Sequence, residues 1–164
     1  MLYTAEPRIE VLEKKSLVGM HQPMSFLADT TGQLWSQFMA RYREIQNRYS
    51  EDFISMQVYP ADFNIENFAP NASFEKWAVV EVAQADQLPA GMERYDLAGG
   101  SYAVFSYTGS ASGAPQVFGY IFTRWLPQSK YVLDEREHFE MLLANYDPLN
   151  DESQEEIWIP VKKK

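Results

Sequence analysis

The chain has 164 residues, a length that fits one compact domain of ordinary size and excludes three. Its 14 basic and 23 acidic residues give a formal net charge of −9, and it contains no cysteine. A protein that binds duplex nucleic acid needs a basic surface to neutralise phosphates, and this composition offers none. The absence of cysteine excludes disulfides, thiolate metal sites and a cysteine nucleophile.

Residues 1–8 lack the basic and apolar stretches of a secretion signal, and no apolar run approaches the ~18 residues that a membrane span needs. We therefore expect a cytoplasmic protein with no membrane partner. The chain is also rich in aromatic residues, because 4 Trp, 10 Tyr and 10 Phe make up 15% of it. These side chains either fill a bulky core or line a cavity for a flat or cationic ligand.

The first half of the chain is predicted to fold as strand, helix, strand, strand. Apolar residues alternate in the predicted strands, recur every three or four positions in the helix, and stop at turn residues. In chain order, the expected elements are a strand over 8–26 with a turn near 13–15, a helix from Thr30 or Thr31 to about Tyr49, a strand over 53–59 stopped by Pro60, and a strand over 77–82.

The second half of the chain predicts the same order of elements. They are strands over 92–97 and 101–107 paired through a glycine turn at 98–100, a helix opened by 112–115 and stopped by Pro127, and strands over 139–143 and 156–161. The two helices match position for position, since Leu34-Trp35-x-x-Phe38-Met39-x-x-Tyr42 recurs as Val117-Phe118-x-x-Ile121-Phe122-x-x-Trp125. This recurrence indicates a duplication.

The duplication predicts an α+β fold in which two strand-helix-strand-strand modules are related by pseudo-twofold symmetry. We expect one domain over 1–164, with half 1 about 1–88 and half 2 about 89–164. The halves are expected to form an antiparallel sheet with two long helices and a central cleft, and such seams are common ligand sites. Because the repeat uses the whole length, we expect no DNA-binding domain and no direct contact with nucleic acid.

Motifs in the second half resemble those of a known family. Residues 98–105, followed by Tyr107 and Gly109, read A-G-G-S-Y-A-V-F-x-Y-x-G. Further motifs follow in order: 120–125, Leu126-Pro127-x-Ser129-x-Tyr131, Phe139-Glu140 and 156–162. This pattern resembles the GyrI-like small-molecule-binding family, the effector-binding domain also found behind AraC-type and MerR-type DNA-binding domains.

The resemblance implies a duplicated fold whose aromatic cleft binds lipophilic, often cationic, small molecules around one central glutamate. By motif position that glutamate is Glu140. The sequence departs from the family in two places, since Leu142 stands where a tyrosine is common and Ser101 where a basic residue is common. The nearest tyrosine after Glu140 is instead Tyr146.

Glu140 also stands out by pattern alone. Side chains alternate along a strand, so His138, Glu140 and Leu142 share one face. Burying a carboxylate within an apolar strand costs free energy unless a partner or ligand offsets its desolvation. We therefore expect a raised pKa for Glu140, and a ligand whose positive charge favours the ionised form.

The aromatic residues divide into core candidates and cleft candidates. The rings on the helical stripes are expected in the core: Trp35, Phe38, Phe118, Phe122 and Trp125. Tyrosine and tryptophan combine a ring face with a polar group, which suits a ligand cleft. The cleft candidates are Tyr102, Tyr120 and Trp158, which the resemblance favours, together with Tyr59, Tyr107 and Tyr146.

Other kinds of site find little support in the sequence. His138 and Glu140 are too few ligands for a metal, and His21 is the only other histidine. The acidic stretch over 147–156 lacks the spacing of a calcium loop. Ala111 stands where the motif Gly-x-Ser-x-Gly would place a nucleophile. We expect no metal and no cofactor.

Three functions remain after these exclusions. The favoured one is a stand-alone effector-binding protein that senses or sequesters lipophilic, cationic or aromatic small molecules around Glu140. The second is a hydrolase of toxic lipophilic compounds, in which Glu140 acts as general acid/base and His138 assists. The third is a protein-interaction module, such as an inhibitor of DNA gyrase, whose acidic surface mimics the charge of DNA.

Overall fold

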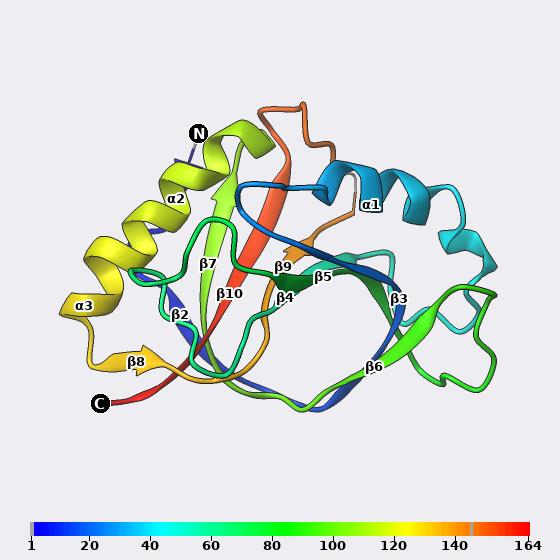
Figure 1. Cartoon of the computed structure of the whole chain (residues 1–164), viewed down its shortest axis with the longest axis horizontal. Helices are drawn as coiled ribbons and strands as arrows, with labels where there is room; N and C mark the ends of the chain where they lie inside the picture. The colour runs from blue at the N-terminus through cyan, green and yellow to red at the C-terminus, as the bar shows by residue number, and fades with distance from the viewer. Residues whose placement is uncertain (1, 145) are drawn as a thin grey trace.

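The structure is a computed structural model that describes residues 2–144 and 146–164 (Figure 1). Its strands are β1 (Leu2–Tyr3), β2 (Arg8–Leu12), β3 (Lys15–Met24), β4 (Phe53–Val58), β5 (Phe74–Val82), β6 (Glu93–Leu97), β7 (Gly100–Thr108), β8 (Tyr131–Leu133), β9 (His138–Leu142) and β10 (Gln154–Lys163). Its helical segments are α1 (Thr31–Met39), the 3-10 turns η1 (Tyr42–Glu44) and η2 (Ala111–Gly113), α2 (Ala114–Tyr120), the π-helical turn η3 (Ile121–Trp125) and α3 (Leu126–Gln128). None of the helices in the described residues has the length and apolar character that a membrane crossing requires.

The strands form one antiparallel sheet. Its order is β1-β7-β10-β9-β4-β5-β3-β6, while β2 also pairs with β7 and β8 with β10. The helices α1 and α2 lie on the same side of this sheet, one over each half (Figure 1). The middle of the sheet, where β4 pairs with β9, therefore lies between the two helices.

The two halves follow the same plan. From the central pair outward, the strands run β4, β5, β3 on one side and β9, β10, β7 on the other. At the centre Ser55 faces Glu140. Helix positions that match in the sequence are buried alike, Leu34 with Val117, and Phe38 with Ile121: all four are at most 1% exposed. The predicted α+β fold with two related halves is confirmed.

The predicted pair formed by strands 92–97 and 101–107 is wrong. β6 pairs with β3, whereas β7 pairs with β2 and β10. The glycines between β6 and β7 bend the chain instead of reversing it, with φ of 88° at Gly99 and 125° at Gly100. A side chain at Gly99 would also collide with the carbonyl oxygen of Leu12. Glycine is required there because only it combines positive φ with this close approach of the backbone.

Both predicted helix ends also differ from the structure. The first helix ends at Met39 and not near Tyr49, because Arg41 leaves the helical region and Ile45 is extended. In the second half, helical structure continues past Trp125 through Pro127. The wider π-helical turn η3 precedes this proline, and a widened turn relieves the clash between a proline ring and the preceding carbonyl groups.

The core occupies both faces of the sheet. The face away from the helices carries one cluster: Leu17, Ile54, Met56, Trp77, Val79, Leu97, Tyr102, Val104, Phe139 and Trp158. On the helix side, α1 and α2 each cover a separate cluster. Of the rings predicted in the core, Phe38 and Trp125 are buried, whereas Trp35, Phe118 and Phe122 are half-buried at its edge. The strip between the two helical clusters is where polar side chains gather.

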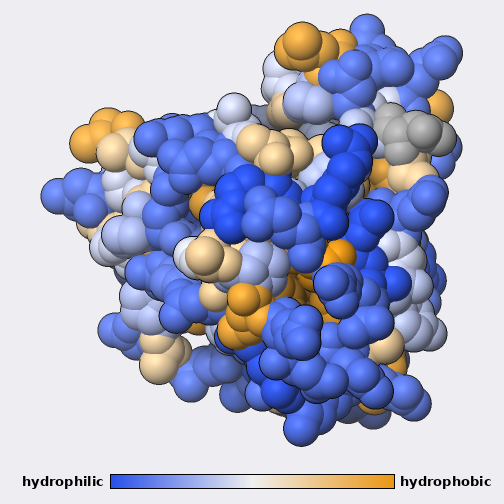
Figure 2. Space-filling view, turned by 90° about the vertical axis from the view of Figure 1, so that its right-hand side faces the viewer, coloured by the Kyte–Doolittle hydropathy of each residue, from blue (hydrophilic) through white to orange (hydrophobic). Residues whose placement is uncertain are grey.

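The acidic excess lies mostly on the surface. Figure 2 shows a largely hydrophilic face with small, separate hydrophobic spots. Such isolated spots are ordinary for a folded chain and mark no docking surface.

One surface histidine links stability to pH. His21 stacks on Trp77 with ring centroids 4.1 Å apart and contacts the carboxylates of Glu75 and Glu93. Partial burial disfavours the imidazolium, but the two carboxylates outweigh it and raise the pKa of His21. A raised pKa in the folded state contributes stability that is complete below the unfolded pKa and is lost as pH rises through the folded value.

We therefore expect His21→Gln to lower the free energy of unfolding more at about pH 5.5 than at about pH 9, by under about 1 kcal/mol because the pair is partly exposed. Urea unfolding of both proteins at the two pH values measures this difference. An equal loss at both pH values would contradict the assignment of a charged His21.

Candidate functional site

A group of charged side chains lies at the centre of the sheet on the helix side. Glu140 of β9 accepts a hydrogen bond from the Nε2 atom of Gln57 to its Oε1 atom, at 3.0 Å. The Nζ atom of Lys76 on β5 lies 3.9 Å from the same oxygen. The side chains of Lys76 and Glu140 are only 7% and 12% exposed. On the intervening strand β4, Gln57 lies opposite Lys76 and Ser55 lies opposite Glu140.

A second carboxylate, Glu155, belongs to this group. It lies on β10 opposite Leu142, and alternation along β9 places it on the same face as Glu140. Burial, together with repulsion from Glu140, raises the pKa of Glu155 to about 8, against the attraction of Lys76. Burial also raises the pKa of Glu140, although Lys76 and Gln57 oppose that rise. The raised pKa expected for Glu140 is thus present. We call Lys76, Glu140 and Glu155 the charged triad.

Aromatic rings pack beside the charged triad. His138, two residues before Glu140 on β9, is buried, and burial lowers its pKa to about 3, which keeps the ring neutral. Tyr59 meets His138 edge-on at 5.0 Å between centroids and stacks on Phe63 at 3.9 Å. Phe122 of η3 stacks on the other side of His138 at 6.3 Å. Tyr59 and Phe63 therefore cover the region next to Glu140.

The segment that supplies this cover is the loop between β4 and β5. Its Phe68 packs on both Tyr59 and Phe63, and all three belong to a ring cluster that includes Phe26 and Phe74. A hydrogen bond of 2.8 Å from the backbone N–H of Leu27 to the carbonyl of Pro70 fixes the loop. The aromatic side chains of this loop thus pack on one another and on the end of β4.

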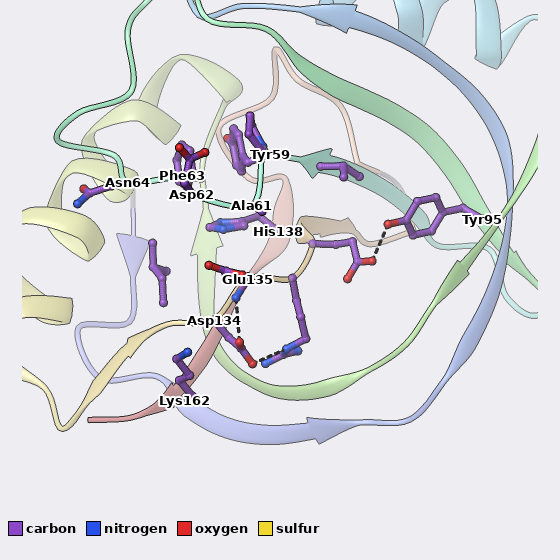
Figure 3. A pocket seen from close by; sticks show the side chains of 15 residues that line it. Tyr59, Ala61, Asp62, Phe63, Asn64, Tyr95, Asp134, Glu135, His138 and Lys162 are labelled. Atoms are coloured by element: carbon purple, nitrogen blue, oxygen red, sulfur yellow. Dashed lines mark hydrogen bonds and ion pairs between the residues drawn. The ribbon is translucent and has the colours of Figure 1, made fainter.

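A cavity of about 510 Å³ opens where β4 ends and β9 begins. Figure 3 shows Tyr59, Phe63 and His138 on one side of it and Asp134 and Lys162 on the other. The full lining is Val58, Tyr59, Pro60, Ala61, Asp62, Phe63, Asn64, Tyr95, Leu133, Asp134, Glu135, Arg136, Glu137, His138 and Lys162. Glu140 is not among the residues that line this cavity, whereas His138, two residues before it on β9, is.

Two of the predicted cleft residues lie on the opposite face of the sheet. Tyr102 is fully buried there and donates a hydrogen bond of 2.9 Å to the carbonyl of Glu137. Trp158 stacks on Phe139 at 5.2 Å. Neither ring is part of the group around Glu140.

The other tyrosines fall in different places. Tyr120 of α2 is half-buried and packs against the core cluster under that helix, and its hydroxyl donates to the carbonyl of Ala5 at 2.8 Å. Tyr107 and Tyr146 lie near Glu155, and burial together with Glu155 raises the pKa of both, that of Tyr146 to about 12. With Tyr59, three of the six tyrosine and tryptophan candidates therefore neighbour the charged triad.

Sequence reasoning missed several members of the site. Lys76 and Glu155 each lie one residue before the predicted start of a strand, at Trp77 and Glu156. Phe63 lies between the predicted strands over 53–59 and 77–82, where the sequence predicts no element. Among the described residues, no group of three or more histidine, aspartate or glutamate side chains is arranged to hold a metal.

Comparison with known proteins identifies related sequences and folds. The transcriptional regulator BrlR of Pseudomonas aeruginosa is 29% identical over 147 residues, which cover 89% of this chain and 52% of the regulator. The chain thus spans about half the length of that relative. An integron cassette protein of Vibrio cholerae shares the fold with a TM-score of 0.69, at 13% identity over 96% of both chains. The structure of SAV2435 bound to tetraphenylphosphonium has a TM-score of 0.64, at 19% identity over 99% of this chain and 94% of the other.

The family assignment rests on a match over almost the entire sequence. The GyrI-like small molecule binding domain matches residues 5–162. The motif that carried the resemblance, including Glu140, lies within this range. This chain therefore belongs to the GyrI-like small molecule binding domain family.

Proposed function

We propose that this chain binds lipophilic cations in the region around Glu140, and so senses or sequesters them. The observation that carries the proposal is a carboxylate buried at the centre of the sheet beside aromatic rings. Burying a charge is costly unless it is paired, and the triad contains two carboxylates for one lysine. A ligand that brings a positive charge improves this balance. The related structure that holds tetraphenylphosphonium supports a ligand of the same class.

Binding would combine two kinds of contact. Rings such as Tyr59, Phe63 and Phe122 offer stacking and cation–π contacts, each contributing about 0.5–2 kcal/mol. The carboxylate of Glu140 adds attraction in a region of low dielectric constant. Apolar contacts favour large aromatic ligands, and the carboxylate selects those with a positive charge.

The direct test is a calorimetric titration of the full chain with tetraphenylphosphonium. We expect a dissociation constant in the micromolar range, which corresponds to a binding free energy of about −8 kcal/mol. The neutral triphenylphosphine oxide, with similar rings and no net charge, serves as the control and should bind more weakly. Absence of tetraphenylphosphonium binding would contradict the proposal.

We expect access to Glu140 to require the rings of the β4–β5 loop to move, because Tyr59 and Phe63 pack against His138, two residues before Glu140 on β9. An aromatic pair contributes about 0.5–1.5 kcal/mol, so removing one ring favours the open loop by that amount. We expect Phe63→Ala to bind tetraphenylphosphonium about two- to tenfold faster, since the competent state becomes more populated. Stopped-flow tryptophan fluorescence measures the association rate.

The matched control for this change is Tyr120→Ala, which removes a half-buried ring of α2 that packs on Tyr3 and not on the β4–β5 loop. Its association rate should equal that of the unmodified chain. A Phe63→Ala rate that is unchanged or slower would show that the loop does not limit access.

A further inference from the structure

The charged triad contains one more negative group than positive. Lys76 and Glu155 occupy equivalent positions in the two halves. The central pair of residues is Ser55 of β4 and Glu140 of β9. Lys76 lies opposite Gln57, two residues after Ser55, and Glu155 lies opposite Leu142, two residues after Glu140. The duplication thus places a cation and a carboxylate on either side of Glu140. Burial lowers the pKa of Lys76, and attraction by Glu140, Asp29 and Glu155 opposes that shift. With Lys76 charged, the triad is neutral only if its two carboxylates hold one proton between them.

Burial raises the pKa of both carboxylates, and the polar partners of Glu140 point to Glu155 as the residue that holds the proton. Glu140 has Lys76 at 3.9 Å and a hydrogen bond from Gln57, both of which stabilise its ionised form. For Glu155, burial and repulsion from Glu140 outweigh the attraction of Lys76 and raise the pKa of Glu155 to about 8. Protonated Glu155 beside the Lys76–Glu140 pair gives a site with no net charge near neutral pH.

The remaining ionisable groups around Glu155 do not compete for this role. Tyr107 of β7 and Tyr146 after β9 keep their protons, because burial raises the pKa of both. Tyr59, on the side of β4, likewise has a raised pKa. His138 on β9 stays neutral, since burial lowers its pKa to about 3. Asp29 acts on the triad only through its attraction for Lys76.

We propose that Glu155 exchanges its proton for the cationic ligand: when a lipophilic monocation binds beside Glu140, Glu155 releases one proton to solvent. This inference rests on the proposed function. The charges balance, since the triad holds Lys76 positive, Glu140 negative and Glu155 neutral before binding. Afterwards the ionised Glu155 offsets the charge of the ligand. Glu155 is thus a specificity-determining residue for cations.

The experiment is calorimetry of tetraphenylphosphonium binding at about pH 7 in buffers of different ionisation enthalpy, such as phosphate and Tris. The dependence of the measured enthalpy on the buffer gives the number of protons released. We expect close to one proton per ligand for the unmodified chain and none for Glu155→Gln. The matched control is Glu156→Gln, the next residue on β10, which points to the opposite face and should leave the release unchanged.

The pH dependence gives a second measurement that needs no variant. Release of one proton makes the affinity rise about tenfold per pH unit below the pKa of Glu155 and level off above it. Binding without proton release, or release that persists in Glu155→Gln, would overturn the inference while leaving the proposed function intact. Failure of tetraphenylphosphonium to bind at all would overturn both.

Discussion

Replacing Glu140 by glutamine is expected to weaken tetraphenylphosphonium binding about ten- to hundredfold while changing triphenylphosphine oxide binding less than about threefold. The range follows from the about 1.5–3 kcal/mol that contacts to a charged group contribute, at 1.4 kcal/mol per factor of ten. The cation loses its carboxylate, whereas the neutral compound keeps every apolar contact. Calorimetric titration of both compounds against both proteins measures the two ratios.

The fold should tolerate Glu140→Gln, because the triad can rearrange its charges. With Glu140 neutral, Glu155 no longer experiences its repulsion, and its ionised form can balance Lys76. Glu156→Gln, an exchange of the same kind on the other face of the sheet, is the matched control and should affect neither compound. An equal loss of affinity for the cation and the neutral compound would show that Glu140 acts through shape and not through charge.

The sequence was sufficient to predict the fold class and the place of Glu140 within a strand. The match between residues 34–42 and 117–125 correctly indicated two related halves, since the corresponding helix positions are buried in the same way. Alternation around Glu140 placed it on the same face as His138, where the structure has it. These predictions rest on local periodicity, which the sequence records directly.

Strand pairing could not be predicted in the same way. The segment at 98–100 was predicted to be a turn, because two strands joined by glycines usually form a hairpin. In the structure β6 and β7 pair with different neighbours, and this choice depends on contacts between residues far apart in the sequence. For the same reason, Tyr102 and Trp158 could not be assigned to one face of the sheet. Alternation shows which residues of one strand share a face, but not which residues of the neighbouring strand lie on that face.

The charged triad shows how a small error at the end of a strand hides a site. Predicting strands from Trp77 and Glu156 left Lys76 and Glu155 just outside them. Extending the alternation back would have placed Lys76 in line with Ala78, and Glu155 in line with Ile157, on the helix side. A lysine and a glutamate at those positions are the signal that was available, although their approach to Glu140 depends on the pairing of four strands.

Replacing Lys76 by methionine is expected to lower the free energy of unfolding by about 3–5 kcal/mol at about pH 9, as when one partner of a buried ion pair is removed. Methionine preserves most of the apolar part of the lysine side chain, so the loss of stability measures the effect of removing its charge. Without Lys76 the pKa of Glu140 in the folded chain rises further. A group whose folded pKa is raised favours the folded state at low pH and loses that contribution as pH rises. The defect should therefore shrink at about pH 6, where Glu140 can take up a proton.

Two comparisons establish that the ion pair itself is responsible. Lys15→Met removes a partly exposed ion pair, in which the Nζ atom of Lys15 lies 3.0 Å from the Oε1 atom of Glu81. This change should lower the free energy of unfolding by less than about 1 kcal/mol. Combining Lys76→Met with Glu140→Gln removes the ion pair and should restore much of the stability at about pH 9, because Glu155 is then the one carboxylate of the triad and no longer repels a second one. Urea unfolding of these variants at the two pH values measures each effect. If the double variant is no more stable than Lys76→Met, packing of the lysine stem stabilises this part of the sheet and charge does not.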